Sequence, residues 1–305
     1  MRMAIRKRFW VPGVFLLLMA AVGVAFYLRP VSFFNAQADF QLRATGAESK
    51  WVTVSGYKVH YYAIGPENGK PLVLVHGLGG RAGEWHNLMP YLAYAGFRVY
   101  APDLVGYGRS EQPADFSYSV SDEANIVVGF LDALGLKQVD LGGVSMGGWI
   151  VQLVAAHHPE RVSRLMLFDS VGLHVTPDWD TNLFTPQTPA QLDALDHLLM
   201  PNPPHLPDFV ATDFLRHSNR DAWVIRRALS TMLSGKEVTD PLLPELKMPV
   251  LIVWGDLDRI APLSEGQKMH QLIPQSRLEV IQGCGHLAHV QCADRIGPKL
   301  QDFLR

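Results

Sequence analysis

The stretch Leu141-Gly142-Gly143-Val144-Ser145-Met146-Gly147-Gly148 decides the fold. An apolar run precedes it and predicts a buried strand, and apolar residues at helical spacing follow it. Gly143 and Gly147 flank Ser145 in the Gly-x-Ser-x-Gly pattern of a nucleophile elbow, a turn too crowded for side chains at the glycine positions. Such a turn holds the serine Oγ at the first turn of a helix, where amide N–H groups favour negative charge. The stretch therefore predicts a nucleophilic serine between a strand and a helix.

Strands and helices alternate on both sides of this elbow. Continuous apolar runs predict strands that are buried on both faces, and helical patterns separate them. This alternation is typical of a mostly parallel, doubly wound α/β sheet, whose active sites gather at the carboxyl ends of the strands. The expected strands are 51–54, 58–63, 71–75, 97–101, 138–141, 164–168, 250–254 and 278–281, and the expected helices are 120–134, 149–157, 263–272 and 293–304.

The alternation breaks between Ser170 and Pro249, where several prolines separate helical patterns. We interpret this segment as a helical cap inserted after the sixth strand. A chain of 305 residues is long enough for one large domain with such an insertion. We expect cap helices at 189–200, 209–216 and 220–233, a cap over residues 171–241, and an α/β core over residues 51–170 and 242–305.

The first fifty residues have a composition of their own. Residues 1–8 are basic and residues 9–28 carry no charge, and about twenty helical residues span roughly 30 Å, the thickness of a bilayer core. We expect a cytoplasmic basic segment, a single transmembrane anchor over 9–28, a juxtamembrane connector over 29–50 with an amphipathic helix, and a catalytic domain that is periplasmic or otherwise extracytoplasmic. A cleaved signal peptide is the alternative, with Ala36-Gln37-Ala38 as its cleavage site.

Overall composition excludes some partners and leaves others open. The net charge is −2, so nothing points to nucleic acid. Ala21 and Ala25 lie one turn apart in the predicted span, a spacing of pairing helices that leaves a homodimer open. Cys284 and Cys292 give no disulfide framework, and whether they pair is left open.

A serine hydroxyl becomes a good nucleophile only when a base lies within hydrogen-bond reach and a carboxylate orients that base. In folds with a nucleophile elbow these residues follow in the order serine, acid, histidine. Asp258 follows the seventh expected strand and His286 follows the eighth, each in a glycine-flanked loop. We therefore predict the catalytic residues Ser145 as nucleophile, His286 as general base and Asp258 as its orienting acid.

Two other carboxylates compete for the role of the acid. Asp256 is two residues from Asp258, and Asp169 follows the sixth strand. Among the other histidines, His76 precedes a loop glycine and is expected to serve loop structure, and His289 falls at the start of a helix.

The tetrahedral intermediate of acyl transfer needs about two preorganised N–H donors. The residue after the nucleophile, Met146, supplies one, and Leu78 in the loop after the third strand is the candidate for the second. We expect Gly77 and Gly79 of that loop to line the approach of substrate. Trp223, one of the large apolar residues of the cap, is a further candidate for substrate binding.

Five ordered motifs resemble the α/β-hydrolase superfamily over residues 51–305. They are His76-Gly77-Leu78-Gly79-Gly80, Asp103-Leu104-x-Gly106-x-Gly108-x-Ser110, Gly143-x-Ser145-Met146-Gly147-Gly148, Trp254-Gly255-x-x-Asp258 and Gly283-x-Gly285-His286. Within the superfamily the chain is similar to membrane-anchored monoacylglycerol lipase-like and lysophospholipase-like hydrolases. The resemblance implies hydrolysis of carboxylic esters, no metal or organic cofactor, and the same three catalytic residues.

The predicted function is therefore a serine carboxylic-ester hydrolase. An anchored domain with an apolar cap favours lipid substrates such as monoacylglycerols, lysophospholipids or medium-chain esters, and small soluble esters are the alternative. The same catalytic residues also serve hydrolases of carbon–carbon bonds in dienones, lactonases and aminopeptidases. A serine at the elbow argues against epoxide hydrolases and haloalkane dehalogenases, which use aspartate. A membrane-tethered binding protein without catalysis is disfavoured because every catalytic position is filled.

Overall fold

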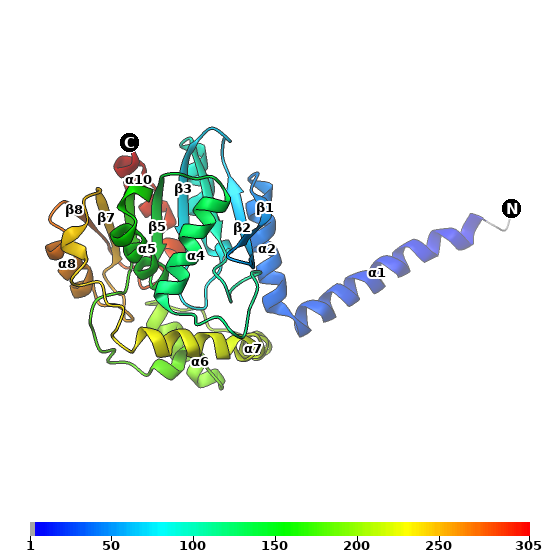
Figure 1. The fold of residues 1–305 in the computed structure, drawn as a ribbon. Helices are drawn as coiled ribbons and strands as arrows, with labels where there is room; N and C mark the ends of the chain where they lie inside the picture. Colours follow the sequence, from blue (N-terminus) through cyan, green and yellow to red (C-terminus); the bar gives the residue numbers. More distant parts are fainter. Residues whose placement is uncertain (1–3) are drawn as a thin grey trace.

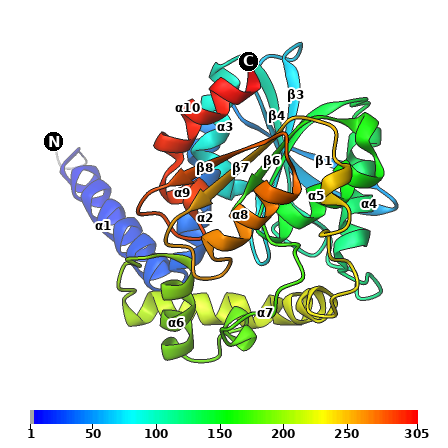
Figure 2. The same cartoon turned by 90° about the vertical axis from the view of Figure 1, so that its left-hand side faces the viewer.

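The structure is a computed structural model in which the backbone is described for residues 4–305 and the side chains for residues 14–305. It contains a central sheet with helices on both faces and a helical layer across one end (Figures 1 and 2). The expected α/β architecture with an inserted cap is thus confirmed.

Eight strands form one sheet in the order β1-β2-β4-β3-β5-β6-β7-β8. Strand β2 runs antiparallel to both of its neighbours, the edge strand β1 and β4, and β4, β3, β5, β6, β7 and β8 are parallel to one another. Strand β5 is central and all six of its residues are buried, as expected for a strand with helices on both faces. The strands are β1 Glu48–Val54, β2 Tyr57–Ile64, β3 Lys70–Val75, β4 Phe97–Pro102, β5 Val139–Val144, β6 Val162–Phe168, β7 Val250–Gly255 and β8 Ser276–Ile281.

Each face of the sheet has its own apolar core. The helices α4 Val120–Ala133, α5 Met146–His157 and α8 Leu263–Leu272 cover one face, and α3 Leu88–Tyr94, α9 Ala288–Gln291 and α10 Ala293–Leu304 cover the other. Short 3₁₀ turns η1 Ala82–His86, η2 Pro159–Arg161 and η4 Leu243–Glu245 connect these elements. The sequence did not predict η1 and α3, because α3 has seven residues and a proline in its first turn, which leaves little helical periodicity to detect.

The cap consists of the 3₁₀ turn η3 Thr181–Phe184 and the helices α6 Pro189–Leu199 and α7 Asp208–Met232. The sequence predicted two helices where α7 is one continuous helix of 25 residues, so that prediction is wrong. The residues between the two expected helices, 217–219, include neither glycine nor proline. A helix without a breaker continues through such a polar stretch when its neighbours support it.

Two helices precede the sheet. Helix α1 Ala4–Leu28 extends away from the rest of the molecule, and α2 Pro30–Ala44 turns back onto it (Figure 1). Residues 1–3 of the predicted cytoplasmic segment lie outside the described residues, as do the side chains of residues 4–13. In the part of the chain whose side chains are described, no single helix is long and apolar enough to cross a membrane. The helical stretches Val14–Leu28 and Pro30–Ala44 pass that test only as a pair bent by 104°.

Helix α2 is the connector that the sequence predicted to be helical, and it packs on the domain. Asp213 of α7 is 1 % exposed and accepts a hydrogen bond from the Val31 amide at 3.1 Å. Asp39 of α2 forms ion pairs with Arg81 and Arg109 of the core. The connector therefore joins both the cap and the loops that follow β3 and β4.

Candidate active site

Ser145 stands in a strained turn between β5 and α5. Its φ is 54°, in the left-handed region that non-glycine residues rarely adopt. A Cβ on Gly143 would lie 2.2 Å from the Gly147 carbonyl oxygen, and one on Gly147 would lie 2.3 Å from the His76 carbonyl oxygen. The Ser145 amide donates to the Phe168 carbonyl of β6 at 3.0 Å. Crowding and this hydrogen bond hold the turn in the nucleophile-elbow geometry.

The structure brings together the three residues that the sequence singled out. Nε2 of His286 lies 2.8 Å from Oγ of Ser145, and Nδ1 of His286 lies 2.8 Å from Oδ2 of Asp258. The other carboxylate oxygen of Asp258 accepts hydrogen bonds from the amides of Ile260 and Ala261, at 2.8 and 3.0 Å. His286 and Asp258 are 2 % and 6 % exposed. This chain of hydrogen bonds can move a proton from the serine hydroxyl to the imidazole.

The competing carboxylates have other partners. Asp256 accepts a hydrogen bond from the Gly283 amide at 2.5 Å and so ties together the loops that follow β7 and β8. Asp169 accepts from the Gly255 amide at 2.7 Å. Burial, and secondly the charge of Asp258, raise the pKa of Asp169 well above its usual value. Burial thus disfavours the charged form of Asp169, and Asp258 is the carboxylate that contacts the imidazole.

The backbone amides of Met146 and Leu78 belong to the two segments that meet at the serine. Met146 follows Ser145 at the first turn of α5, and Leu78 follows the close contact between Gly77 and Ser145, where a Cβ on Gly77 would lie 3.1 Å from the Ser145 Cβ. Among the residues that the structure describes, neither amide has a hydrogen-bond acceptor. Both N–H groups thus lack a partner in the described part of the chain, and their role as oxyanion donors stays a prediction.

His76 shapes the loop that carries Leu78, as the sequence predicted. Its Nδ1 lies 2.8 Å from the Gly77 carbonyl, and its Nε2 accepts from the Leu104 amide at 3.0 Å. Burial lowers the pKa of His76, and its buried neighbour Asp103 does not reverse that shift. A neutral imidazole that uses one nitrogen as donor and the other as acceptor satisfies both loops.

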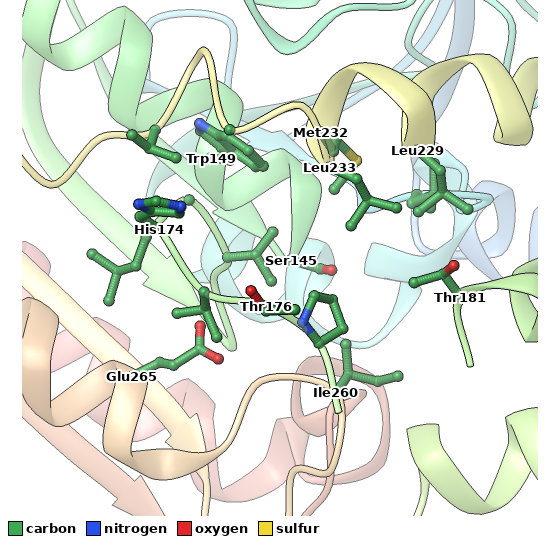
Figure 3. Close-up of a pocket in the computed structure, with 18 of the residues that line it drawn as sticks. Ser145, Trp149, His174, Thr176, Thr181, Leu229, Met232, Leu233, Ile260 and Glu265 are labelled. Atoms are coloured by element: carbon green, nitrogen blue, oxygen red, sulfur yellow. The ribbon is translucent and has the colours of Figure 1, made fainter. Parts of the chain in front are cut away.

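Two cavities meet at Ser145. The first, which we call the Trp149 cavity, has a volume of about 570 Å³ and lies between the core and the cap (Figure 3). It is lined mainly by apolar side chains from α5, the loop that follows β6, and the end of α7. They include Trp149, Val171, Leu229, Met232, Leu233 and Ile260, and polar residues at its edge include His174, Thr176 and Glu265.

The second cavity, which we call the His286 cavity, has a volume of about 470 Å³. It lies over the loop that follows β3 and is bounded by α6, α7 and α2. Many polar groups line it, and Val31 and Asn35 bring the connector helix into its wall. Its lining includes Gly77, Gly79, Glu84, Gln112, Asp221, His286 and His289.

Two residues of the His286 cavity were not predicted as site residues. Burial raises the pKa of Glu84 to about 7 and lowers that of His289 to about 3. His289 packs against Trp85 with ring centroids 4.7 Å apart. Nothing in the sequence separates these residues from ordinary loop and helix positions, because only the fold brings α9 against η1.

Some of the predicted substrate-binding residues line a cavity at Ser145, and one does not. Gly77 and Gly79 line the His286 cavity, and Leu78 lines both cavities. Trp223 lies elsewhere: its indole is 36 % exposed and packs edge-on against Tyr118 with ring centroids 5.5 Å apart. Trp223 lines neither cavity, so we assign it no part in the site.

The two cysteines form a disulfide, which settles the question that the sequence left open. Cys284 and Cys292 are joined across eight residues, on either side of His286. Nη2 of Arg295 lies 2.7 Å from Sγ of Cys284 and 2.8 Å from Sγ of Cys292. The loop that carries His286 is therefore closed covalently onto the start of α10.

A serine elbow at the end of a central parallel strand, with a cap inserted after the sixth strand, defines the class of α/β hydrolases. The family described as alpha/beta hydrolase fold matches residues 70–291, and the chain belongs to this family of hydrolases.

Relatives within the family differ in their substrates. A 2-hydroxymuconate semialdehyde hydrolase of Pseudomonas putida is 31% identical over 274 residues, which cover 83% of this chain and 92% of the relative. Lipase 1 of Psychrobacter immobilis is 27% identical over 281 residues, 87% of this chain and 86% of the lipase. The crystal structure of a membrane phospholipase A superposes with a TM-score of 0.82 at 28% identity and covers 98% of both chains.

Proposed function

We propose that this hydrolase cleaves carboxylic esters of lipid origin, such as monoacylglycerols, lysophospholipids or medium-chain esters, through an acyl-enzyme on Ser145. The observation that carries the proposal is the hydrogen-bonded series Ser145–His286–Asp258 at the junction of two cavities beneath an apolar cap. The lipase and phospholipase relatives support the same substrate class.

In the first half of the reaction, Oγ of Ser145 attacks the acyl carbon while Nε2 of His286 takes the hydroxyl proton. Asp258 accepts the Nδ1–H hydrogen bond, which fixes the tautomer and stabilises the imidazolium that forms. The carbonyl oxygen becomes an oxyanion, and the amides of Leu78 and Met146 donate to it. The imidazolium then gives its proton to the departing alcohol oxygen, and the acyl group remains on Ser145.

In the second half, a water molecule attacks the acyl-enzyme with His286 again acting as base. The same two amides stabilise the second oxyanion. Its collapse releases the carboxylic acid and returns the proton to Oγ of Ser145. Each donor is a main-chain group, so the side chains of Leu78 and Met146 are free to serve packing.

The two cavities suit the two halves of an ester. The imidazole must reach the alcohol oxygen, and His286 lines the more polar His286 cavity, so we assign the alcohol to that side. The acyl chain then extends into the Trp149 cavity, whose walls are largely apolar. Burial of methylene groups against such walls contributes about 0.8 kcal/mol per CH₂.

A second candidate function is hydrolysis of carbon–carbon bonds. It is favoured by the relatives named as hydrolases of 2-hydroxymuconate semialdehyde and of 2-hydroxy-6-oxo-dienoates, which are 29% to 32% identical to this chain. The same nucleophile and base would serve that reaction, in which the leaving group is a carbon atom that must take up a proton as its bond to the acyl carbon breaks.

The deciding experiment compares substrates on the wild type and on Ser145→Ala. We expect the wild type to cleave p-nitrophenyl esters and monoacylglycerols with a preference for acyl chains of medium length or longer. We expect Ser145→Ala to lose about 10⁶-fold in kcat. Cleavage of a 2-hydroxy-6-oxo-dienoate at a higher kcat/KM than any ester would replace the ester proposal with the second candidate.

We also propose that α1 and α2 hold the catalytic domain at a membrane, on the extracytoplasmic side. Apolar side chains of α1 between Val14 and Leu28 are exposed, and disulfides such as Cys284–Cys292 persist in oxidising compartments. A homodimer stays a prediction from the Ala21 and Ala25 spacing. Fractionation of cells that express residues 1–305 or 45–305 tests the association, which fails if both chains are equally soluble.

A further inference from the structure

Glu265 is a carboxylate that the proposed reaction does not use, although it lines the cavity that holds Ser145. It lies in the first turn of α8, seven residues after Asp258. Figure 3 shows its carboxyl group directed into the Trp149 cavity from the wall opposite Trp149. Among the residues that the structure describes, this carboxyl group has neither an ion pair nor a hydrogen bond.

The described part of the cavity wall supplies no fixed cation. The described residues that line the Trp149 cavity include two charged side chains, Asp180 and Glu265, and both are acidic. Asp180 is exposed and accepts hydrogen bonds from Asn182, so it belongs to the mouth. His174 is the one lining residue that could become positively charged. An anionic group that entered this cavity would therefore meet a carboxylate and find no fixed partner.

The charge of Glu265 depends on the groups around it. Burial first, and then the charge of Asp258, raise the pKa of Glu265 to about 7, and Asp240 acts in the same direction. His286 and Lys268 act in the opposite direction. Glu265 is therefore largely ionised above about pH 7 and largely neutral below it.

We propose that Glu265 is a specificity-determining residue, which excludes acyl groups that carry a carboxylate from the Trp149 cavity and restricts the enzyme to uncharged acyl chains. The inference rests on the proposed ester hydrolysis, because it needs the acyl chain to lie in this cavity. The physical reason is the repulsion between two like charges in a cavity whose described walls offer no fixed counter-charge.

The test uses two substrates that share a leaving group and nearly share a shape. They are the p-nitrophenyl monoester of adipic acid, whose acyl chain ends in a carboxylate, and p-nitrophenyl 6-methylheptanoate, whose chain ends in an isopropyl group of similar size. The ratio of their kcat/KM values isolates the effect of the charge. We expect Glu265→Gln to raise the relative kcat/KM of the adipate monoester about tenfold at pH 8.

A matched control is Glu160→Gln, which removes a carboxylate with the same change of side chain at an exposed site after α5. We expect it to leave the ratio within twofold of the wild type. Thermal denaturation of all three proteins verifies that the variants are folded.

The pH dependence gives a second measurement. Between pH 6 and 8.5 the adipate monoester stays ionised, so the wild-type ratio of adipate to neutral ester should fall as the pH rises through about 7. The ratio should be flat in Glu265→Gln. Dependence of the catalytic residues on pH cancels, because both substrates use them.

Three results would overturn the inference. A ratio that Glu265→Gln changes by less than twofold removes the proposed repulsion. An equal loss on both substrates assigns Glu265 to support of the catalytic residues instead, and a flat wild-type ratio shows that its charge is not felt. If the wild type hydrolysed neither ester in a Ser145-dependent way, the proposed function itself would fail. That outcome is distinct from a failure of the proposal about Glu265, which changes only the ratio of the two kcat/KM values.

Discussion

The sheet edge that carries Ser145 and the cap that covers it are built under different constraints. Every residue of α5 from Met146 to Ala155 is buried, and so is all of β5. In the cap, η3 has no buried residue, α6 has two, Leu192 and Leu195, and eight of the 25 residues of α7 are buried. A substitution at a fully buried position meets atoms on all sides and is poorly tolerated, whereas a residue in a less buried layer has room to vary. The reacting groups of this fold therefore lie in its most completely buried part, beneath a cap whose residues are buried less completely.

The largest effect is expected from Gly147→Ala in the core. The new Cβ would lie 2.3 Å from the His76 carbonyl oxygen and 2.4 Å from the Val75 carbonyl oxygen, so the elbow or the Leu78 loop must move. We expect kcat/KM to fall more than about 100-fold, since displacement of about 1 Å has that effect, with a loss of roughly 1–3 kcal/mol in stability. Ester hydrolysis and urea denaturation measure both.

The control for that variant is Gly135→Ala after α4, where φ is +68° and no atom lies within 4 Å of the new Cβ. We expect it to cost about 1 kcal/mol in stability through backbone strain alone and to leave kcat/KM within twofold. Equal losses of activity in the two glycine variants would contradict the importance of crowding at the elbow.

The pH dependence of stability should come from the core as well. Glu123 of α4 is 1 % exposed, and among the described residues neither oxygen has a hydrogen-bond partner. Burial raises the pKa of Glu123 well above its usual value, so the folded state keeps a proton that the unfolded state releases above about pH 4.3. Stability due to this group is therefore lost as the pH rises towards the folded-state pKa.

Glu123→Gln removes that titration. We expect the free energy of unfolding of the variant to fall less steeply between pH 5 and 8, by up to about 1.4 kcal/mol per pH unit. Urea denaturation at several pH values measures the slope. Parallel plots of unfolding free energy against pH for the wild type and the variant would contradict this role of Glu123.

The smallest effect is expected in the cap. Phe184 of η3 lines both cavities and packs against Trp179 with ring centroids 5.4 Å apart. We expect Phe184→Ala to widen the junction and change the ratio of kcat/KM for long and short acyl chains about three- to tenfold, with little change in Tm. An unchanged chain-length profile would show that η3 does not contact the substrate.

Much of the fold could be predicted because its signals are local. The helices 263–272 and 293–304 agree with α8 and α10 to the residue, and the parallel strands were each found within three residues. The failures were short or polar elements. Helix α3 carries too few turns to show a period, and α7 was divided at a polar stretch that tertiary contacts keep helical.

The residues of the candidate site also differ in whether the sequence could identify them. Ser145, Asp258 and His286 follow strand ends in glycine-rich loops, which is a signal that the sequence shows directly. The carboxyl groups of Glu265 and Glu84 leave no such mark, because an isolated glutamate in a helical turn is usually a solvated surface group. Their burial and their altered pKa values arise only when distant segments enclose them.

Local spacing along the chain was enough to predict most strands and helices, the elbow at Ser145 and a short set of candidates for the base and its acid, since each depends on near neighbours. Only the tertiary structure decided that Asp258 rather than Asp169 contacts His286, that Cys284 and Cys292 pair, and that two cavities meet at the serine. Those features depend on distances between residues far apart in the chain, and such distances exist only after the chain has packed.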